Sequence, residues 1–340
     1  MSKRKLTRRQ QWRIDKIQDE RSARVAKRDS VADEHVQDGQ LGAEQEGLII
    51  THFGTQVVVE STNPNGEKQE QRCHFRSNLG SLVTGDKVVW CAGNPMGVVV
   101  AVLPRRSALH RPDPYGDLKT IAANIDQLII VIAPYPEAHA NLVDRYLIAA
   151  HTVNLEPVIL INKSDAIDEK IKPKMDLLEK TYRDLGYKVV KISTLTKESL
   201  DDLQSLLNNK ISVFVGQSGV GKSSLINVLI PDAQLRVGNL SERQQGTHTT
   251  TSAVLLHFPT GGDLIDSPGI REFGLWHMDA EEILEGFIEF RPYLGHCKFR
   301  DCSHNHEPNC ALLKALEKGD ISQSRMDSYR SILNSLKENG

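Results

Sequence analysis

The stretch ISVFVGQSGVGKSSLINVLI, residues 211–230, decides the fold of this 340-residue chain. It begins with an apolar, β-branched run that predicts a buried strand, and its end predicts a helix. Between them stands the pattern G-x-x-x-x-G-K-[ST], in which backbone amides and the helix N-terminus wrap around a phosphate chain. A plain glycine turn is the alternative. We interpret the stretch as a nucleotide-binding loop formed by Gly216, Gln217, Ser218, Gly219, Val220, Gly221, Lys222, Ser223 and Ser224.

The sequence on both sides of this loop alternates between strand-like and helix-like segments. This alternation is typical of a doubly wound α/β sheet, which carries its ligand at the carboxyl ends of its strands. The buried-strand candidates are residues 126–134, 156–162, 187–193, 211–216, 252–258 and 262–269.

A second motif, VILINKSD at residues 158–165, is predicted to read the base. Asp165 at a strand end can accept two hydrogen bonds from guanine, whereas adenine would leave that carboxylate partly unpaired. Asn162 would brace the turn, and Lys163 would lie along the base plane. Four residues alone are a weak signal, but a strand before them and a phosphate loop in the same chain strengthen it. The predicted guanine site comprises Asn162, Lys163, Ser164 and Asp165, with Ser193 and Thr194 supplying backbone amides to the guanine carbonyl.

Side chains from three segments are predicted to surround the phosphates and a magnesium ion. Lys222 should reach the β- and γ-phosphates, and the Ser223 hydroxyl should bind Mg²⁺. The segment GTHTTT, residues 246–251, offers a threonine that completes the metal sphere. We favour Thr250, and Thr249 is the alternative.

The stretch DLIDSPG, residues 263–269, supplies the last element of the site. Asp266 is placed to hold the magnesium shell through water, and the Gly269 amide can contact the γ-phosphate. Ile270 follows where many GTPases have the glutamine that orients the attacking water. Because isoleucine cannot form a hydrogen bond, we expect His248 to take that role, although it can also be an ordinary loop histidine.

These elements occur in the order base reader, base support, phosphate loop, threonine segment and Asp-x-x-Gly. This order is a circular permutation of the usual GTPase order. The site can be unchanged in space if the old chain ends are joined. We therefore predict a GTPase core with reordered parts.

A cluster of soft ligands stands near the C-terminus, in CKFRDCSHNHEPNC at residues 297–310. Three thiolates and one imidazole form a closed tetrahedral set that is typical of structural zinc. We prefer His304 as the imidazole, with His296 and His306 as competitors. The predicted ligands of one structural zinc ion are Cys297, Cys302, His304 and Cys310.

Charge and composition distinguish two further regions of the chain, residues 1–30 and about 46–103. Residues 1–30 hold 11 Lys or Arg and four acidic residues, although the net charge of the whole chain is −2. Such a basic segment suits an anchor for nucleic acid or a disordered, solubilising tail. The short β-branched runs from about 46 to 103 predict a small barrel, of which the OB-fold is one type. No apolar run approaches the ~20 residues that span a bilayer, so we expect a cytosolic protein.

Together these motifs resemble the RsgA (YjeQ) family, bacterial GTPases of small ribosomal subunit biogenesis. The resemblance rests on the permuted order, the motifs at 216–224, 246–251 and 266–269, and the late Cys/His cluster. It implies an N-terminal OB-fold, a circularly permuted G domain and a zinc domain, which grip the small subunit near its decoding region. It also implies that His248 replaces the missing glutamine and that the subunit stimulates hydrolysis.

On this basis we predict an α/β P-loop GTPase core between an all-β OB-fold barrel and an α-helical zinc-binding domain. The expected partners are the small ribosomal subunit, its rRNA and GTP or GDP, with no membrane and a monomeric state. An RNA-binding module in which nucleotide only orders the fold is the alternative, and Ile270 keeps it open. The expected divisions are a basic tail at 1–40, the OB-fold at 41–105, the G domain at 106–275 and the zinc domain at 276–340.

Overall fold

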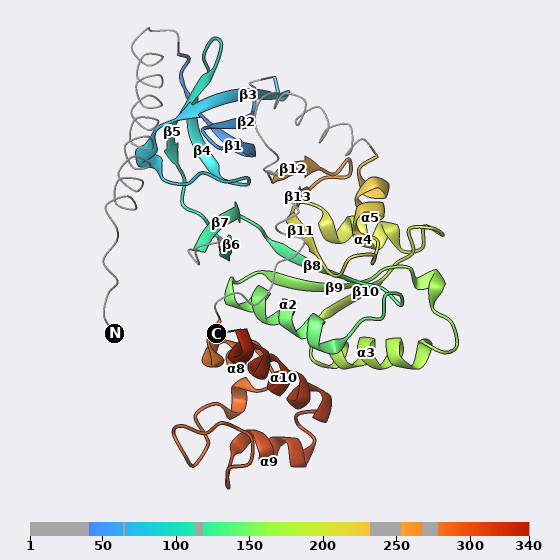
Figure 1. Ribbon diagram of the computed structural model, residues 1–340. Coiled ribbons are helices and arrows are strands. Elements are labelled where there is room, and N and C mark those ends of the chain that lie inside the picture. Colours follow the sequence, from blue (N-terminus) through green and yellow to red (C-terminus); the bar gives the residue numbers. More distant parts are fainter. Residues whose placement is uncertain (1–40, 64, 113–117, 232–252, 267–277, 340) are drawn as a thin grey trace, which may run out of the picture. The chain divides into compact units, whose positions relative to one another are not determined.

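The computed structural model describes residues 41–63, 65–112, 118–231, 253–266 and 278–339. The chain divides between Arg106 and Ser107 into two units, and the short stretch 252–254 belongs with the first of them. Figure 1 shows the two units as a blue and a green-to-red part of the chain. Within the described residues, no helix is both long enough and apolar enough to cross a membrane.

Five strands of the first unit close into a barrel. β1 pairs with β2, β2 with β3, β3 with β5, β5 with β4, and β4 with β1, so no edge is left open. All pairs are antiparallel except β3–β5, and this closed five-stranded arrangement confirms the expected OB-fold. The strands are β1 (Glu44–Phe53), β2 (Gln56–Thr62), β3 (Lys68–Phe75), β4 (Lys87–Cys91) and β5 (Gly97–Val102), with a 3-10 turn, η1, at Ser77–Leu79.

Trp90 fills the centre of the barrel and is 1% exposed. Gly47 on the paired strand makes room for it, because a Cβ at Gly47 would lie 2.7 Å from Trp90 Nε1 and 2.4 Å from Val59 Cγ1. The chain leaving the barrel is tied back by Arg105, whose Nε donates to Oδ1 of the fully buried Asp86 at 2.6 Å. Both Cys73 and Cys91 are buried here as ordinary core residues, and burial raises the pKa of the Cys73 thiol to about 12.

The second unit is built on a sheet in the order β10-β9-β8-β11-β13-β12. The pairs β10–β9, β9–β8, β8–β11 and β11–β13 are parallel, as the alternating sequence pattern predicted. Every residue of β8 and β11 is buried, because helices cover both faces of the sheet. The strands are β8 (Gln127–Ile132), β9 (Glu156–Ile161), β10 (Lys188–Lys191), β11 (Ile211–Val215), β12 (Val254–His257) and β13 (Asp263–Asp266).

Among the residues that the structure describes, four helices flank this sheet, two on each face. In Figure 1, α2 (Ala140–Thr152) and α3 (Lys172–Asp184) lie below the sheet, and α4 (Leu200–Leu207) and α5 (Lys222–Leu229) lie above it. A short hairpin of β6 (Ala108–Pro112) and β7 (Leu118–Ala123) precedes β8. The sheet thus presents the carboxyl ends of β9, β8 and β11 side by side.

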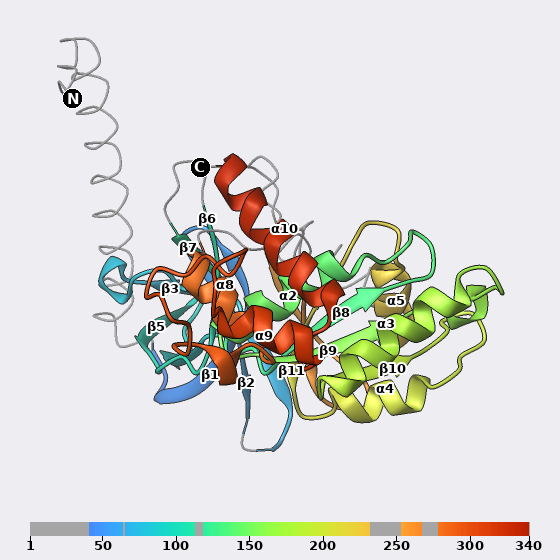
Figure 2. The same cartoon turned by 90° about the horizontal axis from the view of Figure 1, so that it is seen from below.

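The C-terminal part is helical and packs on α2. It contains α8 (Ala280–Gly286), the 3-10 turn η3 (Arg291–Tyr293), α9 (Ala311–Lys318) and α10 (Gln323–Asn339). Figure 2 shows α10 lying against α2, and both α8 and α10 contact that helix. Gly286 permits close packing, since a Cβ there would lie 2.6 Å from Ile148 Cγ2.

Candidate nucleotide-binding site and metal centre

The predicted phosphate loop connects β11 to α5. Three of its glycines have φ angles that other residues rarely adopt: 141° at Gly216, 82° at Gly219 and 96° at Gly221. A Cβ at Gly216 would lie 2.1 Å from the carbonyl oxygen of Val131, and one at Gly221 would lie 2.4 Å from Asn162 Nδ2. The glycines therefore let this loop approach both the end of β8 and the base-reading turn.

Lys222 begins α5, and its side chain folds back on the phosphate loop. Its Nζ donates to the carbonyl oxygens of Gly216 at 2.6 Å and Gln217 at 2.7 Å. This position puts the ammonium beside the loop that the motif assigns to phosphate oxygens. Ser223 and Ser224 follow in the first turn of α5, with exposed side chains.

The predicted base-reading turn follows β9 and is bonded to the phosphate loop. Asn162 is fully buried, and its Nδ2 donates to the carbonyl oxygen of Val220 at 2.9 Å. Lys163 Nζ donates to the carbonyl oxygen of Gly219 at 2.7 Å. Because β8 separates β9 from β11 in the sheet, these bonds span one strand. The structure thus brings the two motifs together although their order in the chain is reversed.

The loop after β10 is bonded to Asp165. Ser193 Oγ donates to Asp165 Oδ1 and accepts the amides of Leu195 at 3.2 Å and Thr196 at 3.1 Å. Ser193 is buried, and Thr194 follows at a half-buried position. This arrangement fixes one carboxylate oxygen of Asp165 and leaves the residue itself exposed at the edge of the sheet.

Asp266 ends β13, which runs parallel to β11. It therefore lies at the edge from which the phosphate loop leaves the sheet, as the Asp-x-x-Gly motif predicted. The remaining candidates, His248, Thr249, Thr250 and Gly269, lie outside the described residues, as does Ile270. The roles assigned to them stay predictions.

The structure brings the four predicted zinc ligands together. One donor atom from each of Cys297, Cys302, His304 and Cys310 lies within 4.8 Å of all the others. Nδ1 of His304 is 3.5 Å from Cys297 Sγ and 3.4 Å from Cys310 Sγ, and the latter two sulfurs are 3.9 Å apart. Ligands at about 2.3 Å for sulfur and 2.0–2.1 Å for nitrogen give tetrahedral edges of roughly 3.5–3.6 Å between nitrogen and sulfur and about 3.8 Å between two sulfurs. The donor set therefore fits a tetrahedral metal ion, and His296 and His306 are not part of it.

Glu307 organises the turn that carries His304, a role the sequence pattern did not reveal. Its carboxylate accepts the hydroxyl and the amide of Ser303 and the amides of Asn305 and His306. The Ser303 hydroxyl and these amides hold the pKa of Glu307 well below its usual range. Because His304 has a positive φ of 58°, this network supports a backbone conformation that is otherwise unfavourable.

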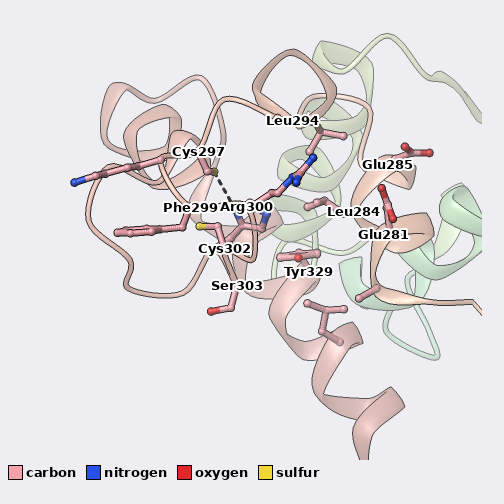
Figure 3. Close-up of a pocket in the computed structure, with 15 residues that line it drawn as sticks. Glu281, Leu284, Glu285, Leu294, Cys297, Phe299, Arg300, Cys302, Ser303 and Tyr329 are labelled. Carbon is pink, nitrogen blue, oxygen red and sulfur yellow. Dashed lines mark hydrogen bonds between the residues drawn. The ribbon is translucent and has the colours of Figure 1, made fainter.

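A cavity of about 680 Å³ lies beside the metal cluster (Figure 3). Leu284 and Tyr329 contribute apolar surface, and Glu281, Glu285 and Arg300 contribute charge. The cavity thus joins the metal-binding turn to α8 and α10.

Comparisons with known proteins agree with this geometry. A family model described as RsgA GTPase matches residues 102–276. The small ribosomal subunit biogenesis GTPase RsgA of Pseudomonas fluorescens strain Pf0-1 is 58% identical over the full length of both chains. The protein of the same name from Pseudomonas aeruginosa is 57% identical over 99% of each chain. The chain belongs to the RsgA GTPase family.

Two solved structures resemble it. YjeQ from Thermotoga maritima has a TM-score of 0.71 and 32% identity, and the match covers 86% of this chain and 99% of that one. YloQ, described as a circularly permuted GTPase, has a TM-score of 0.69 and 28% identity, with 88% and 96% covered. Membership in the RsgA GTPase family confirms the predicted reaction class, GTP hydrolysis, and the permuted order of the core.

Two groups of polar residues in this RsgA GTPase were not predicted from the sequence. Tyr135 donates a hydrogen bond to Asp168, just beyond the base-reading turn, and the position of Tyr135 shortly after a buried strand was the signal that could have revealed it. Asp144, Glu289 and Arg325 form a buried charged network between α2 and the C-terminal helices. Its signal was Asp144, a carboxylate on the apolar face of a helix.

Proposed function

We propose that this protein binds the small ribosomal subunit late in its assembly and hydrolyses GTP to GDP and phosphate with stimulation by the subunit. Hydrolysis would then release the protein from the subunit. The observation that carries the nucleotide part is the pair of bonds from Asn162 and Lys163 to the phosphate loop. The names of the full-length relatives support the ribosomal part. The proposed setting is the bacterial cytoplasm, with the protein as a monomer.

The nucleotide would bind along the carboxyl ends of β9, β8 and β11. Asp165 would accept the guanine N1–H and amine protons, and Lys163 would lie along the base. The amides of residues 216–221 and the Lys222 ammonium would hold the phosphates. Ser223 and Thr250 would hold Mg²⁺, and His248 would orient the attacking water. Positioning is most of what a protein supplies to this reaction.

Residues outside the nucleotide site would hold the rRNA. The OB-fold, at 41–105 in the proposed division, belongs to a class of barrels that binds oligonucleotides. The basic segment within residues 1–40 would add sequence-independent phosphate contacts. In the same division, residues 106–275 form the G domain and residues 276–340 the zinc domain.

Zinc is the metal that we propose for the Cys297, Cys302, His304 and Cys310 cluster. Three thiolates and one imidazole leave no open coordination position, so the ion would cross-link the turn and perform no chemistry. It would thereby hold the segment between η3 and α9 in place.

Phosphate release under multiple turnover, with and without purified small subunits, tests the proposal. We expect slow GTP turnover by the protein alone and at least about tenfold faster turnover with subunits, since a macromolecular partner can complete a GTPase site. Lys222→Ala is the negative control, because it removes the phosphate-binding cation. GTP binding without turnover in either condition would instead support the RNA-binding module.

A further inference from the structure

Tyr135 lies in the turn that follows β8 and belongs to no nucleotide motif. Its carbonyl oxygen accepts from Lys163 Nζ at 3.3 Å, and the same ammonium donates to Gly219 at 2.7 Å. The next residue, Pro136, lies against the phosphate loop, since a Cβ at Gly219 would be 3.6 Å from Pro136 Cδ. The main chain at Tyr135 and Pro136 therefore contacts both the base-reading turn and the phosphate loop.

The side chain of Tyr135 reaches the far end of the same turn. Its hydroxyl donates to Asp168 Oδ2 at 3.0 Å, and Asp168 Oδ1 accepts the amides of Lys170 at 3.0 Å and Ile171 at 2.9 Å. The Ile171 amide and the Tyr135 hydroxyl lower the pKa of Asp168, so its carboxylate is an ionised acceptor at neutral pH. Tyr135 thus forms hydrogen bonds with the side chains at both ends of the segment 163–168, Lys163 and Asp168.

This segment carries Asp165, the residue assigned to the guanine base. A chain held at both ends samples fewer conformations, so less ordering is needed when a ligand binds. A second tie from the same loop, an ion pair of Glu137 and Lys174 at 2.6 Å, reaches α3 but does not touch the turn. The loop after β10 holds the middle of the segment, through Ser193 on Asp165 and the Ser164 amide on the carbonyl oxygen of Ile192 at 3.0 Å. The Tyr135 hydroxyl holds its far end, at Asp168.

We propose that Tyr135 is a positioning residue that retains guanine nucleotide by fixing the segment 163–168. The proposal rests on the proposed function, because it assumes that Lys163 and Asp165 contact the base. The hydroxyl would slow the dissociation of GTP and GDP, since its hydrogen bond to Asp168 has to break before the segment can move away from the base.

Tyr135→Phe tests the role of this hydrogen bond directly. It removes one oxygen atom from a residue that is 45% exposed, so the fold should stay intact. We expect a fluorescent GDP analogue to dissociate about three- to tenfold faster, the range for losing one hydrogen bond. Tyr293→Phe is the matched control. Tyr293 also donates to an exposed carboxylate, Asp320 at 2.9 Å, but it lies in the C-terminal helical part. The GDP analogue should dissociate from Tyr293→Phe at the wild-type rate.

A double-mutant cycle separates positioning from a general effect on the loop. Tyr135→Phe in an Asp168→Ala background should cause no further acceleration, because the bond is already lost. Equal dissociation rates for Tyr135→Phe and the wild type, or additive effects in the cycle, would overturn the inference alone. A wild-type protein that binds no guanine nucleotide would overturn the proposed function, and this inference with it.

Discussion

At the residue scale, we propose that Asp165 determines which base the site accepts, and its replacement tests that role. Asp165→Asn puts an amide donor where guanine presents donors, so we predict that GTP binding weakens by roughly 2–4 kcal/mol, the scale for a charged hydrogen-bonded pair. Xanthine nucleotides should bind better to the variant, because xanthine has a carbonyl where guanine has its amine. Equilibrium titration with GTP and XTP measures both changes.

A second aspartate provides the control for this exchange. Asp184 lies on α3 in an exposed ion pair with Lys180, away from the base-reading turn. Asp184→Asn should leave both affinities unchanged. Unchanged GTP affinity in Asp165→Asn would show that another residue reads the base.

At the scale of whole elements, the buried ionic network of Asp144, Glu289 and Arg325 links α2 to α10. Arg325 is 3% exposed, and its guanidinium bonds to Asp144 and to Glu289 at 2.6 Å while lying 4.4 Å above the Phe287 ring. Burial alone would lower the pKa of Arg325, but the two carboxylates raise it. Tyr182 of α3 also donates to Asp144, at 2.6 Å. Hydrogen bonds from α3 and α10 therefore meet at one buried carboxylate of α2, Asp144.

Removing that cation should be costly. Arg325→Met leaves Asp144 buried without its ion-pair partner, so we predict a loss of about 3–5 kcal/mol in the free energy of unfolding of the second unit. Urea unfolding measures it, with Lys180→Met in an exposed pair as the control that should change little. The double variant Arg325→Met, Asp144→Leu should recover part of the loss, since it removes the buried Asp144 charge together with Arg325 and leaves only Glu289 without its partner. No recovery would mean that Arg325 acts mainly through Glu289 or through its packing on Phe287.

The metal-binding turn is the other element whose stability depends on a few side chains. Cys302→Ser should lower bound zinc and speed hydrogen exchange across residues 297–310, while GTP affinity stays nearly intact because the cluster contains no nucleotide-site residue. Elemental analysis and exchange measure the two effects. His306→Ala should keep full zinc, because His306 is not part of the cluster. Full zinc in Cys302→Ser would show that the ligand set is wrong.

For the whole molecule, local patterns were enough to predict the parts but not their cross-connections. The phosphate loop, the parallel strands and the four metal ligands each lie within short stretches of sequence, so periodicity and spacing reveal them. The barrel type depends on closure of β1 on β4, which pairs Glu44 with Cys91, and no local pattern encodes that contact. The bond between Asp144 and Arg325 spans 181 residues. Such long-range polar contacts depend on the assembled fold, and a single sequence does not show them.

The proposed coupling of hydrolysis to the ribosomal subunit also concerns the whole molecule, and we propose that it depends on His248. In-line attack needs a water held opposite the bond that breaks, and Ile270 can supply only an apolar surface. His248 stands two residues before Thr250, so the threonine's contact with Mg²⁺ would bring the imidazole near that water. We predict that His248→Ala keeps GTP affinity and GTP-dependent subunit binding but loses most of the subunit-stimulated rate.

Single-turnover GTP cleavage with saturating small subunits measures this loss, with His110→Ala as a control histidine variant that should cleave at the wild-type rate. The His248→Ala complex should also persist longer on the subunit, because release follows hydrolysis in the proposed cycle. A cleavage rate within about twofold of the wild type, under ~0.4 kcal/mol of barrier, would assign the water to another group. In that case the subunit itself would be the next source to test, since it can supply the group that Ile270 lacks.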